Sequence, residues 1–403
     1  MLASCALADD WPQWNGPKRD GKSAETGLLA EWPADGPRLV WKATGFGKGY
    51  SSISVAAGRL YTMGDKNDAG CVTAANADDG KILWSTKVGK AGAPGVPGYD
   101  FPGPRSTPTV AGGLIFTLDA WGDLVCLSAA DGKEQWRKSL VKDLGGSPPT
   151  WGFSESPLVD GEQVVVTPGG RKGALAAYNT KTGELLWKSK EFTDAAQYAS
   201  IIPAEIEGIR QYIQLTAASV AGISPKDGAL LWKASRQANI AVIPTPLVMG
   251  NEVYVTSGYG AGCNLFKVTK TNGKFSAEQI YANHVMVNHH GGVVRVNDDI
   301  YGYSEGKGLT CQDAETGKSV WTEKAKIKKG AVASADGKLY FREEETGTMV
   351  LVDATPEGYH EKGRFKQPER SEEMAWAHPV IANGKLYLRD QDVLLCYDIK
   401  TGP

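Results

Sequence analysis

One short phrase recurs along this chain, in which a tight turn ending in Gly is followed four residues later by Trp. Five full copies place this tryptophan at Trp84, Trp136, Trp187, Trp232 and Trp321. Three further copies keep the turn and lack the tryptophan, at Asn272-Gly273, Glu357-Gly358 and Thr401-Gly402. The eight turn glycines are separated by 52, 51, 45, 45, 44, 41 and 44 residues. A repeat of about 40–50 residues with tight glycine turns is typical of a four-stranded propeller blade.

A second series of turns has the same period, as at Asp160-Gly161 and Asn383-Gly384, and each lies between two short apolar segments. Each repeat therefore predicts four strands, A to D, with strand D ending in the tryptophan. The eighth copy has no strand D before Pro403, whereas residues 38–42 carry Trp41 ahead of the first repeat. The sequence predicts an all-β fold: an eight-bladed β-propeller of four-stranded antiparallel blades, with the last blade closed by the N-terminal strand.

The start of the chain indicates export. Residues 1–8 end in Ala6-Leu7-Ala8, which has the small-x-small form of a signal-peptidase site, so we interpret them as the remnant of an export signal. An alternative is lipid anchoring through Cys5. We expect residues 9–37 to be an N-terminal extension that packs on the propeller, residues 38–403 to form the propeller, and the protein to be periplasmic or in the cell envelope.

Charge and hydropathy exclude two classes of partner. The chain has 44 Lys and Arg against 46 Asp and Glu, a formal net charge of -2, and no basic run suited to a phosphate backbone. We therefore expect no nucleic-acid partner. No apolar run reaches the length of a membrane span, so no transmembrane segment is expected.

The repeat carries a family resemblance. The stretch from Ala177 to Trp187 resembles the repeat of the quinoprotein-like (PQQ-like) β-propeller superfamily, which includes BamB and the PQQ alcohol dehydrogenases. Residues 11–17, 102–108 and 288–292 resemble a narrower group of BamB-like bacterial exported proteins. The resemblance implies the propeller fold over nearly the whole chain and leaves the activity open, because one fold serves many functions.

The candidate binding site is on the face that holds the D–A and B–C connections. The D–A connections are the long ones, and long loops on a rigid scaffold commonly carry binding residues. The residues ahead of each strand A should surround the channel there. The candidate binding residues are Tyr50, Arg105, Trp151, Glu155, Tyr198, His284, Asn288, His289, His290, Lys329, Trp376 and His378. Polar groups that only hydrogen-bond each other and water are the alternative.

Metal and disulfide sites are not expected. His284, His289 and His290 are the candidate ligands, but adjacent histidines on a strand point to opposite faces, so His289 and His290 should not share one ion. Cys126, Cys311 and Cys396 each lie six residues before a turn glycine, at equivalent positions of separate blades. They are too far apart to pair, and we interpret them as small core residues.

Two functions remain open, with a sugar-active or lyase site on the rim as a weaker third. The first is an exported, non-catalytic binding or scaffold protein that presents the channel face to a protein or cell-envelope polymer, with no cofactor. The alternative is a dehydrogenase that uses PQQ with calcium. The sequence has no vicinal cysteine pair of the kind that covers the quinone in those enzymes, and few carboxylates gather ahead of the A strands.

Overall fold

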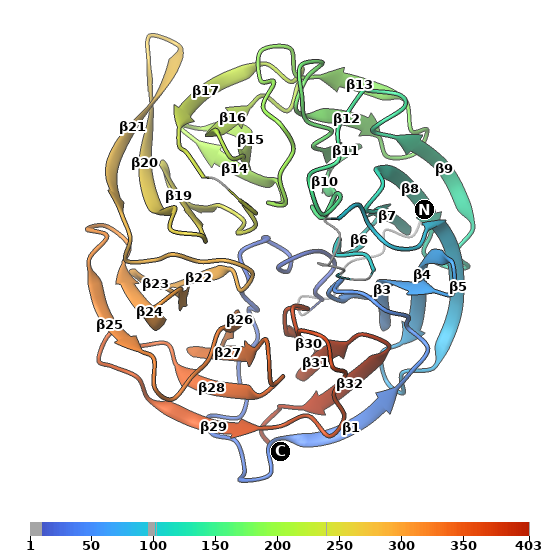
Figure 1. Cartoon of the computed structure of the whole chain (residues 1–403), viewed down its shortest axis with the longest axis vertical. Coiled ribbons are helices and arrows are strands. Elements are labelled where there is room, and N and C mark those ends of the chain that lie inside the picture. The colour runs from blue at the N-terminus through green and yellow to red at the C-terminus, as the bar shows by residue number, and fades with distance from the viewer. Residues whose placement is uncertain (1–9, 96–100, 102, 239, 403) are drawn as a thin grey trace.

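The chain folds into a closed ring of β-sheets (Figure 1). The structure, a computed structural model, describes residues 10–95, 101, 103–238 and 240–402. In that part of the chain, 32 strands form eight four-stranded antiparallel sheets and no helix is present. The prediction of an eight-bladed propeller is confirmed. Residues 1–8 and Cys5, on which the export and lipid-anchor predictions depend, lie outside the described residues.

The blades follow one another in chain order. Blades 1 to 4 consist of β2 (Ser54–Ala56), β3 (Arg59–Lys66), β4 (Ala69–Asn76) and β5 (Ile82–Lys90); β6 (Thr109–Ala111), β7 (Leu114–Leu118), β8 (Asp123–Ser128) and β9 (Glu134–Ser139); β10 (Leu158–Asp160), β11 (Gln163–Val166), β12 (Ala176–Asn179) and β13 (Leu185–Lys188); and β14 (Ile202–Ile206), β15 (Ile209–Leu215), β16 (Ser219–Ile223) and β17 (Leu230–Ser235).

Blades 5 to 8 complete the ring. They consist of β18 (Leu247–Met249), β19 (Glu252–Ser257), β20 (Gly262–Thr271) and β21 (Lys274–Asn283); β22 (Val293–Val296), β23 (Asp299–Ser304), β24 (Gly308–Asp313) and β25 (Ser319–Glu323); β26 (Gly330–Ala335), β27 (Lys338–Glu343), β28 (Met349–Asp353) and β29 (Glu361–Phe365); and β30 (Val380–Ala382), β31 (Lys385–Asp390) and β32 (Val393–Asp398) with β1 (Arg38–Ala43).

Strand β1 closes the ring, as predicted. It pairs antiparallel with β32 from Arg38 opposite Asp398 to Ala43 opposite Leu394. The first strand of the chain is thus the outer strand of the last blade, and in Figure 1 it runs beside β32 at the end of the chain. This pairing joins the two ends of the propeller and leaves no gap between its first and last blades.

Tryptophans at the ends of the D strands contact the following blade. Trp136 Nε1 donates a hydrogen bond to Thr180 O at 2.9 Å, and Trp187 Nε1 donates to Pro225 O at 2.9 Å. Where the indole ring of one blade covers the C–D turn of the next blade, the last residue of that turn must be glycine. At Gly183, which has a φ of 68°, a Cβ atom would lie 2.8 Å from the Trp136 ring. The recurrent Gly and Trp of the sequence are therefore in contact across each such boundary.

Every blade has a β-bulge in its C–D strand pair, at the residue before the tryptophan position. Trp187 pairs with Ala177, but Tyr178 pairs with Leu185, so Leu186 is the extra residue. The bulge register also locates the positions equivalent to the tryptophan where the sequence phrase is degenerate. In blade 5 the position holds Tyr281, whose hydroxyl donates to Ala314 O at 2.9 Å.

In blade 7 the tryptophan position is Gly363, and a tryptophan from elsewhere in the chain covers it. Gly363 pairs with Leu351 next to the bulge. A Cβ atom at Gly363 would lie 2.7 Å from the Cβ atom of Trp32. The Trp32 ring lies 5.9 Å from the Tyr340 ring of β27, just as Trp321 lies 6.0 Å from Tyr301 of β23 in blade 6. Trp32 thus occupies the place of the missing strand-D tryptophan.

The N-terminal segment, residues 10–37, lies across the face of the A–B turns. Trp11 forms a bridge with Val55, and Ser23 N donates to Ser334 O at 2.8 Å. In Figure 1 this segment crosses the middle of the ring. Arg19 is fully buried there and donates to Ser156 O at 2.7 Å and to Pro157 O at 3.1 Å. The segment therefore closes the central channel on this face.

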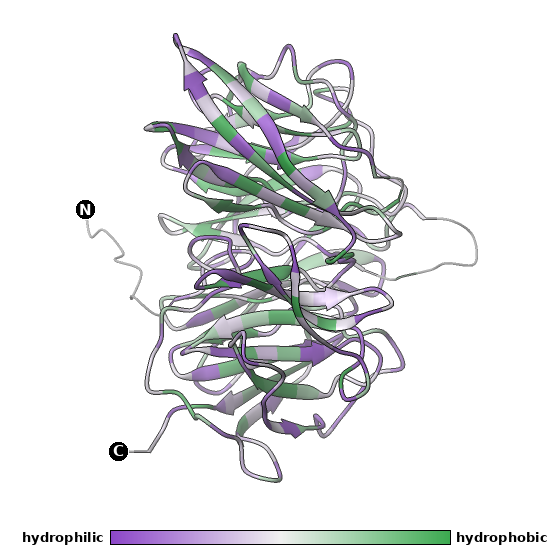
Figure 2. Cartoon of the chain, turned by 90° about the vertical axis from the view of Figure 1, so that its left-hand side faces the viewer, coloured by the Kyte–Doolittle hydropathy of each residue, from purple (hydrophilic) through white to green (hydrophobic). Residues whose placement is uncertain are grey.

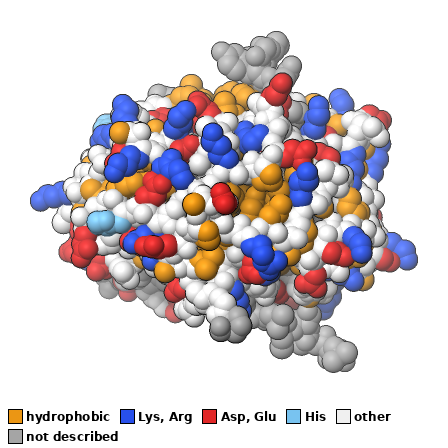
Figure 3. Space-filling model, turned by 90° about the horizontal axis from the view of Figure 1, so that it is seen from below, with side chains coloured by type: hydrophobic (Ala, Val, Ile, Leu, Met, Phe, Trp, Pro, Cys, Tyr) orange, Lys and Arg blue, Asp and Glu red, His pale blue; other side chains and the backbone are white. Residues whose placement is uncertain are grey.

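The core consists of the strand faces that meet between blades. Green apolar residues alternate with purple polar ones along the strands in Figure 2, the pattern of sheets packed face to face. All five described cysteines are buried and unpaired, as expected: Cys71, Cys126, Cys263, Cys311 and Cys396. On the side of the ring seen in Figure 3, positive and negative side chains are interspersed, with no extended basic surface.

Candidate functional site

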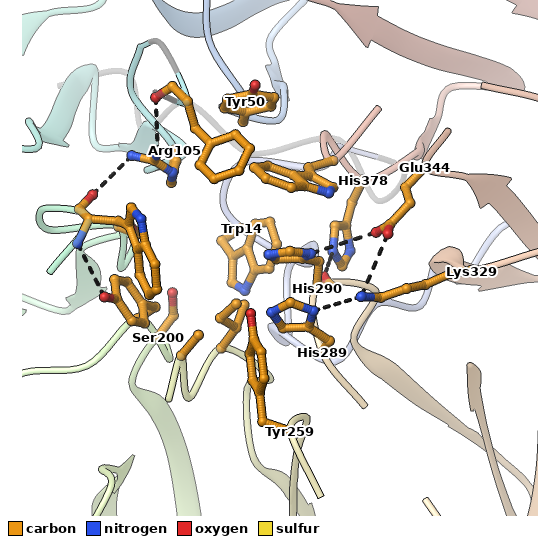
Figure 4. A pocket seen from close by; sticks show the side chains of 17 residues that line it. Trp14, Tyr50, Arg105, Ser200, Tyr259, His289, His290, Lys329, Glu344 and His378 are labelled. Atoms are coloured by element: carbon orange, nitrogen blue, oxygen red, sulfur yellow. Dashed lines mark hydrogen bonds and ion pairs between the residues drawn. The ribbon is translucent and has the colours of Figure 1, made fainter. Parts of the chain in front are cut away.

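A cavity of about 370 Å³ lies at the centre of the ring. Each of the eight D–A connections contributes at least one residue to its wall. The B–C loops of blades 5 and 7 add Tyr259 and Glu344, and Trp14 reaches it from the N-terminal segment. Trp14 Nε1 donates to Thr245 Oγ1 at 2.9 Å, and the Trp14 ring lies 4.6 Å from the His378 ring. Trp14 therefore forms the floor of a pocket whose walls are the loops of the opposite face (Figure 4).

Nine of the twelve sequence-predicted residues line this pocket: Tyr50, Arg105, Trp151, Tyr198, His289, His290, Lys329, Trp376 and His378. Positions ahead of successive A strands converge because all A strands surround the same axis. Whether these residues bind a ligand stays a prediction.

The other three predicted residues lie outside the pocket. His284 is exposed, and its carbonyl accepts a hydrogen bond from Lys307 Nζ at 2.7 Å. Asn288 is buried, and its amide donates to Gly292 O at 2.9 Å and to Tyr303 O at 3.1 Å. The Glu155 carboxylate accepts hydrogen bonds from the backbone and the hydroxyl of Thr167. None of the three lines the cavity, and the Asn288 and Glu155 side chains are bonded within the protein instead.

Eight lining residues were missed in the sequence: Trp14, Phe101, Ser154, Ser200, Ala241, Ile243, Tyr259 and Glu344. Tyr259 and Glu344 could have been predicted from the sequence, because both lie in B–C loops, and these loops share a face with the D–A connections. Trp14 and Phe101 could not, since neither the path of the N-terminal segment nor the shape of the loop at Phe101 follows from the repeat.

Stacked rings form one side of the pocket. The rings of His289 and His290 lie 3.6 Å apart at an interplanar angle of 28°, and the His290 ring lies 4.2 Å from the Trp376 ring. Tyr259 meets His289 edge-on at 4.6 Å, and Tyr50 lies 4.7 Å from Trp376. The expectation that His289 and His290 point to opposite faces was wrong, because both lie in a bend ahead of β22 and not in a strand.

Hydrogen bonds and burial keep these histidines neutral. Lys329 Nζ lies 2.6 Å from His289 Nδ1, and because an ammonium group only donates, the ring proton of His289 is on Nε2. Burial, with His290 and Lys329 nearby, lowers the pKa of His289 to about 2. Burial also lowers the pKa of His378 to about 4 and that of His290 well below its ordinary value.

The two cations of the pocket differ in their partners, and they lie on opposite sides of it in Figure 4. Lys329 lies 3.3 Å from Glu305 and 3.6 Å from Glu344. In the described part of the chain, Arg105 donates to the carbonyl oxygens of Trp151 and Phe101, both at 3.0 Å. Among the described residues no carboxylate lies within ion-pair distance of Arg105, and burial lowers its pKa. Within the described part of the chain, the guanidinium charge at the pocket wall thus has no carboxylate partner at short range.

Several polar atoms around the cavity are buried without a hydrogen-bond partner among the described residues. They are the ring nitrogens His289 Nε2, His290 Nδ1, His378 Nδ1, Trp151 Nε1 and Trp376 Nε1, and the carboxylate oxygen Glu344 Oε2. Two of them, His290 Nδ1 and Glu344 Oε2, lie 3.6 Å from each other, beyond hydrogen-bond distance. Buried polar groups in native proteins are almost always paired, so an unpaired set at one cavity indicates bound water or a ligand. The described residues contain no group of three or more His, Cys, Asp or Glu arranged to hold a metal ion.

Comparison with known proteins places the chain in a family. The family described as outer membrane protein assembly factor BamB matches residues 68–323, more than half of the chain. The chain belongs to the BamB family. The outer membrane protein assembly factor BamB of Shewanella oneidensis is 24% identical over 257 residues, which are 60% of this chain and 61% of that protein. The match thus spans less than two thirds of this curated relative.

Solved structures share the fold. BamB from Moraxella catarrhalis superposes with a TM-score of 0.63 at 13% identity, over 91% of this chain and 98% of that one. Quinohemoprotein alcohol dehydrogenase from Comamonas testosteroni gives 0.66 at 12% identity, over 98% and 81% of the two chains. No helix with the length and apolar character of a membrane span occurs in the described residues.

Proposed function

We propose that this BamB-family propeller is an exported, non-catalytic binding protein that receives part of a cell-envelope ligand or partner protein in the pocket on its D–A face. The observation that carries the proposal is the unpaired set of polar atoms in an aromatic cavity to which every D–A connection contributes. A rigid scaffold with convergent polar groups in a mostly apolar pocket is typical of a binding site. The curated BamB relative, an outer membrane protein assembly factor, supports a role in the envelope with protein partners.

The protonation states favour binding over proton transfer. A general base works best when its pKa is near the working pH. The pKa values of His289 and His378 are lowered to about 2 and about 4, so at neutral pH both rings offer hydrogen bonds but hardly accept protons.

The residues of the pocket do not fit the calcium-bound quinone of the alternative function. Calcium takes six to eight oxygen ligands, several of them carboxylates. Among the described residues, Glu344 is the one carboxylate that lines the cavity, and it lies 3.6 Å from the Lys329 ammonium. The Glu155 oxygens are engaged by Thr167, and the Asn288 amide donates to backbone carbonyls. We therefore propose a function without this cofactor.

Capture from a detergent-solubilised bacterial envelope fraction tests the proposal. The immobilised chain is compared with Trp151→Ala, which alters the pocket, and with Asp298→Ala, whose side chain is 95% exposed at the A–B turn of blade 6. We expect the pocket variant to lose at least about tenfold of the captured material and the control to lose none, because truncating a central aromatic residue costs about 2 kcal/mol of binding. Equal capture by all three folded proteins would contradict a pocket on this face.

A further inference from the structure

The unpaired atoms of the pocket include both donors and acceptors. Trp151 and Trp376 each present an indole N–H, and His289 presents Nε2–H because its Nδ1 faces Lys329. His378 Nε2 lies 3.0 Å from the carbonyl of His290 and donates to it, so His378 Nδ1 presents a lone pair. His378 is 5% exposed and lies directly on the floor residue Trp14. A ligand that satisfies this set must donate hydrogen bonds as well as accept them.

Arg105 adds a requirement for negative charge. Its guanidinium has five N–H donors, of which the two carbonyl oxygens of Trp151 and Phe101 engage two. Across the pocket, Lys329 is balanced by Glu305 and Glu344. With the histidines neutral, the described residues of the pocket wall carry a positive charge at Arg105 that has no carboxylate among them at ion-pair distance. A carboxylate or sulfate group is the natural partner for a planar guanidinium.

The walls between these polar groups are flat and aromatic. Trp151 lies 6.1 Å from Tyr198 on one side, and Trp376 lies between His290 and Phe101 on the other. A cavity of about 370 Å³ is at the small end of ligand pockets, which span roughly 300–1,000 Å³. The occupant is therefore a small unit with apolar faces and a polar rim.

We infer that the pocket binds an acidic sugar: a pyranose ring that carries one carboxylate or sulfate group. The anionic group pairs with Arg105, the ring lies against the Trp and Tyr faces, and the hydroxyl groups, which both donate and accept, satisfy His378 Nδ1 and the indole N–H groups. This inference rests on the proposed function and names the ligand class of the same pocket.

Other ligand classes leave part of the pocket unsatisfied. A neutral sugar leaves the Arg105 charge unpaired. An organic cation is repelled by Arg105, which has no carboxylate at ion-pair distance in the described chain. A flat aromatic carboxylate without hydroxyl groups pairs with Arg105 but leaves the His378 Nδ1 lone pair without a donor. Unlike these three classes, an acidic sugar supplies the anion, the donors and the apolar faces together.

Titration calorimetry with matched saccharides tests the inference. The probes are a galacturonic acid trisaccharide, the same trisaccharide with its carboxylates methyl-esterified, and a sulfated galactose trisaccharide. We expect one or both acidic probes to bind and the ester to bind at least about tenfold more weakly, since a charge-assisted hydrogen bond contributes about 1.5–3 kcal/mol. The acidic probe that binds more tightly identifies carboxylate or sulfate as the preferred anion.

Arg105→Gln and Arg295→Gln are the matched variants, because Arg295 lies on β22 outside the pocket and pairs with Asp298. Arg105→Gln should weaken the acidic probe at least about tenfold and leave the ester unchanged, whereas Arg295→Gln should bind like the parent. Should Arg105→Gln fail to fold, the comparison of acid and ester on the parent chain decides alone. Equal binding of acid and ester, or no binding of either acid, overturns the inference. If envelope capture still depends on Trp151 in that case, the proposed function stands and only the ligand class is wrong.

Discussion

Glu155 shows how a single residue in a predicted site position can have a structural role. It precedes strand β10 as predicted, but its carboxylate turns to Thr167 and lies near the buried Arg19. Burial raises the pKa of Glu155 to about 7, although the Thr167 hydrogen bonds and Arg19 act in the opposite direction. A carboxyl group so placed makes the stability of the channel pH-dependent.

Replacing Glu155 by Gln should remove this dependence. Between the ordinary pKa of 4.5 and the folded value of about 7, the folded chain holds a proton that the unfolded chain releases. The contribution of Glu155 is therefore fully present below pH 4.5 and is lost as the pH rises to 7. Between pH 5 and pH 8, the free energy of unfolding of Glu155→Gln should rise relative to that of the parent by up to about 3 kcal/mol. Thermal unfolding of both proteins at the two pH values measures this difference.

The buried histidines contribute equally to the pH dependence of stability in both proteins, so their contributions cancel in that comparison. Glu162→Gln is the control, because the Glu162 side chain is 79% exposed, and its difference from the parent should not change with pH. A pH-independent difference for Glu155→Gln as well would contradict a proton on Glu155 in the folded protein.

The repeat explains why nine of the predicted residues line one cavity, because it places their side chains beside the channel axis. Arg105, Trp151 and Trp376 precede A strands, so their convergence follows from the propeller fold itself. Side-chain direction does not follow from the repeat, because the D–A connections bend before each strand. For this reason Glu155, Asn288 and His284 could not be separated from the lining residues in advance.

At the scale of elements, blade 7 shows how the N-terminal segment compensates for a defect in the repeat. The degenerate phrase at Glu357-Gly358 indicated the missing tryptophan, but not that Trp32 fills its place over Gly363. Trp32 N also donates to Lys362 O at 2.8 Å, and the Trp32 ring is 7% exposed. Contacts between residues 330 positions apart leave no trace in a single sequence, so this element could not be predicted.

Trp32→Ala should destabilise the protein by about 3–5 kcal/mol, the usual cost of removing a buried tryptophan. Trp321→Ala in blade 6 is the matched variant, because Trp321 has the same ring neighbour on its strand B, and it should lower the thermal midpoint similarly. Leu185→Ala, at a residue that is 48% exposed, should change stability by less than about 0.5 kcal/mol. If Trp32→Ala unfolded at the same temperature as the parent, blade 7 would not need Trp32 in place of its missing strand-D tryptophan.

At the scale of the whole molecule, the two ends of the channel differ. The N-terminal segment closes the A–B face and provides the floor residue Trp14, while loops from all eight blades form the pocket on the other face. The ring, its blade number and its closure by β1 could be predicted, because a constant repeat fixes them. The floor could not, because the N-terminal segment lies outside the repeat. The fold is shared with BamB and with a quinohemoprotein alcohol dehydrogenase, so the fold alone does not decide the activity. The activity must be inferred from the chemistry of the pocket.

Site-specific photo-crosslinking in intact cells tests the central claim, that this propeller binds through its D–A face. A photoreactive residue is introduced at Tyr259, which is 46% exposed at the pocket, or at Asp298, which is exposed at an A–B turn of the opposite face. Our account predicts discrete adducts from position 259 that disappear in the Trp151→Ala background, and none from position 298. Adducts from position 298 alone would contradict it.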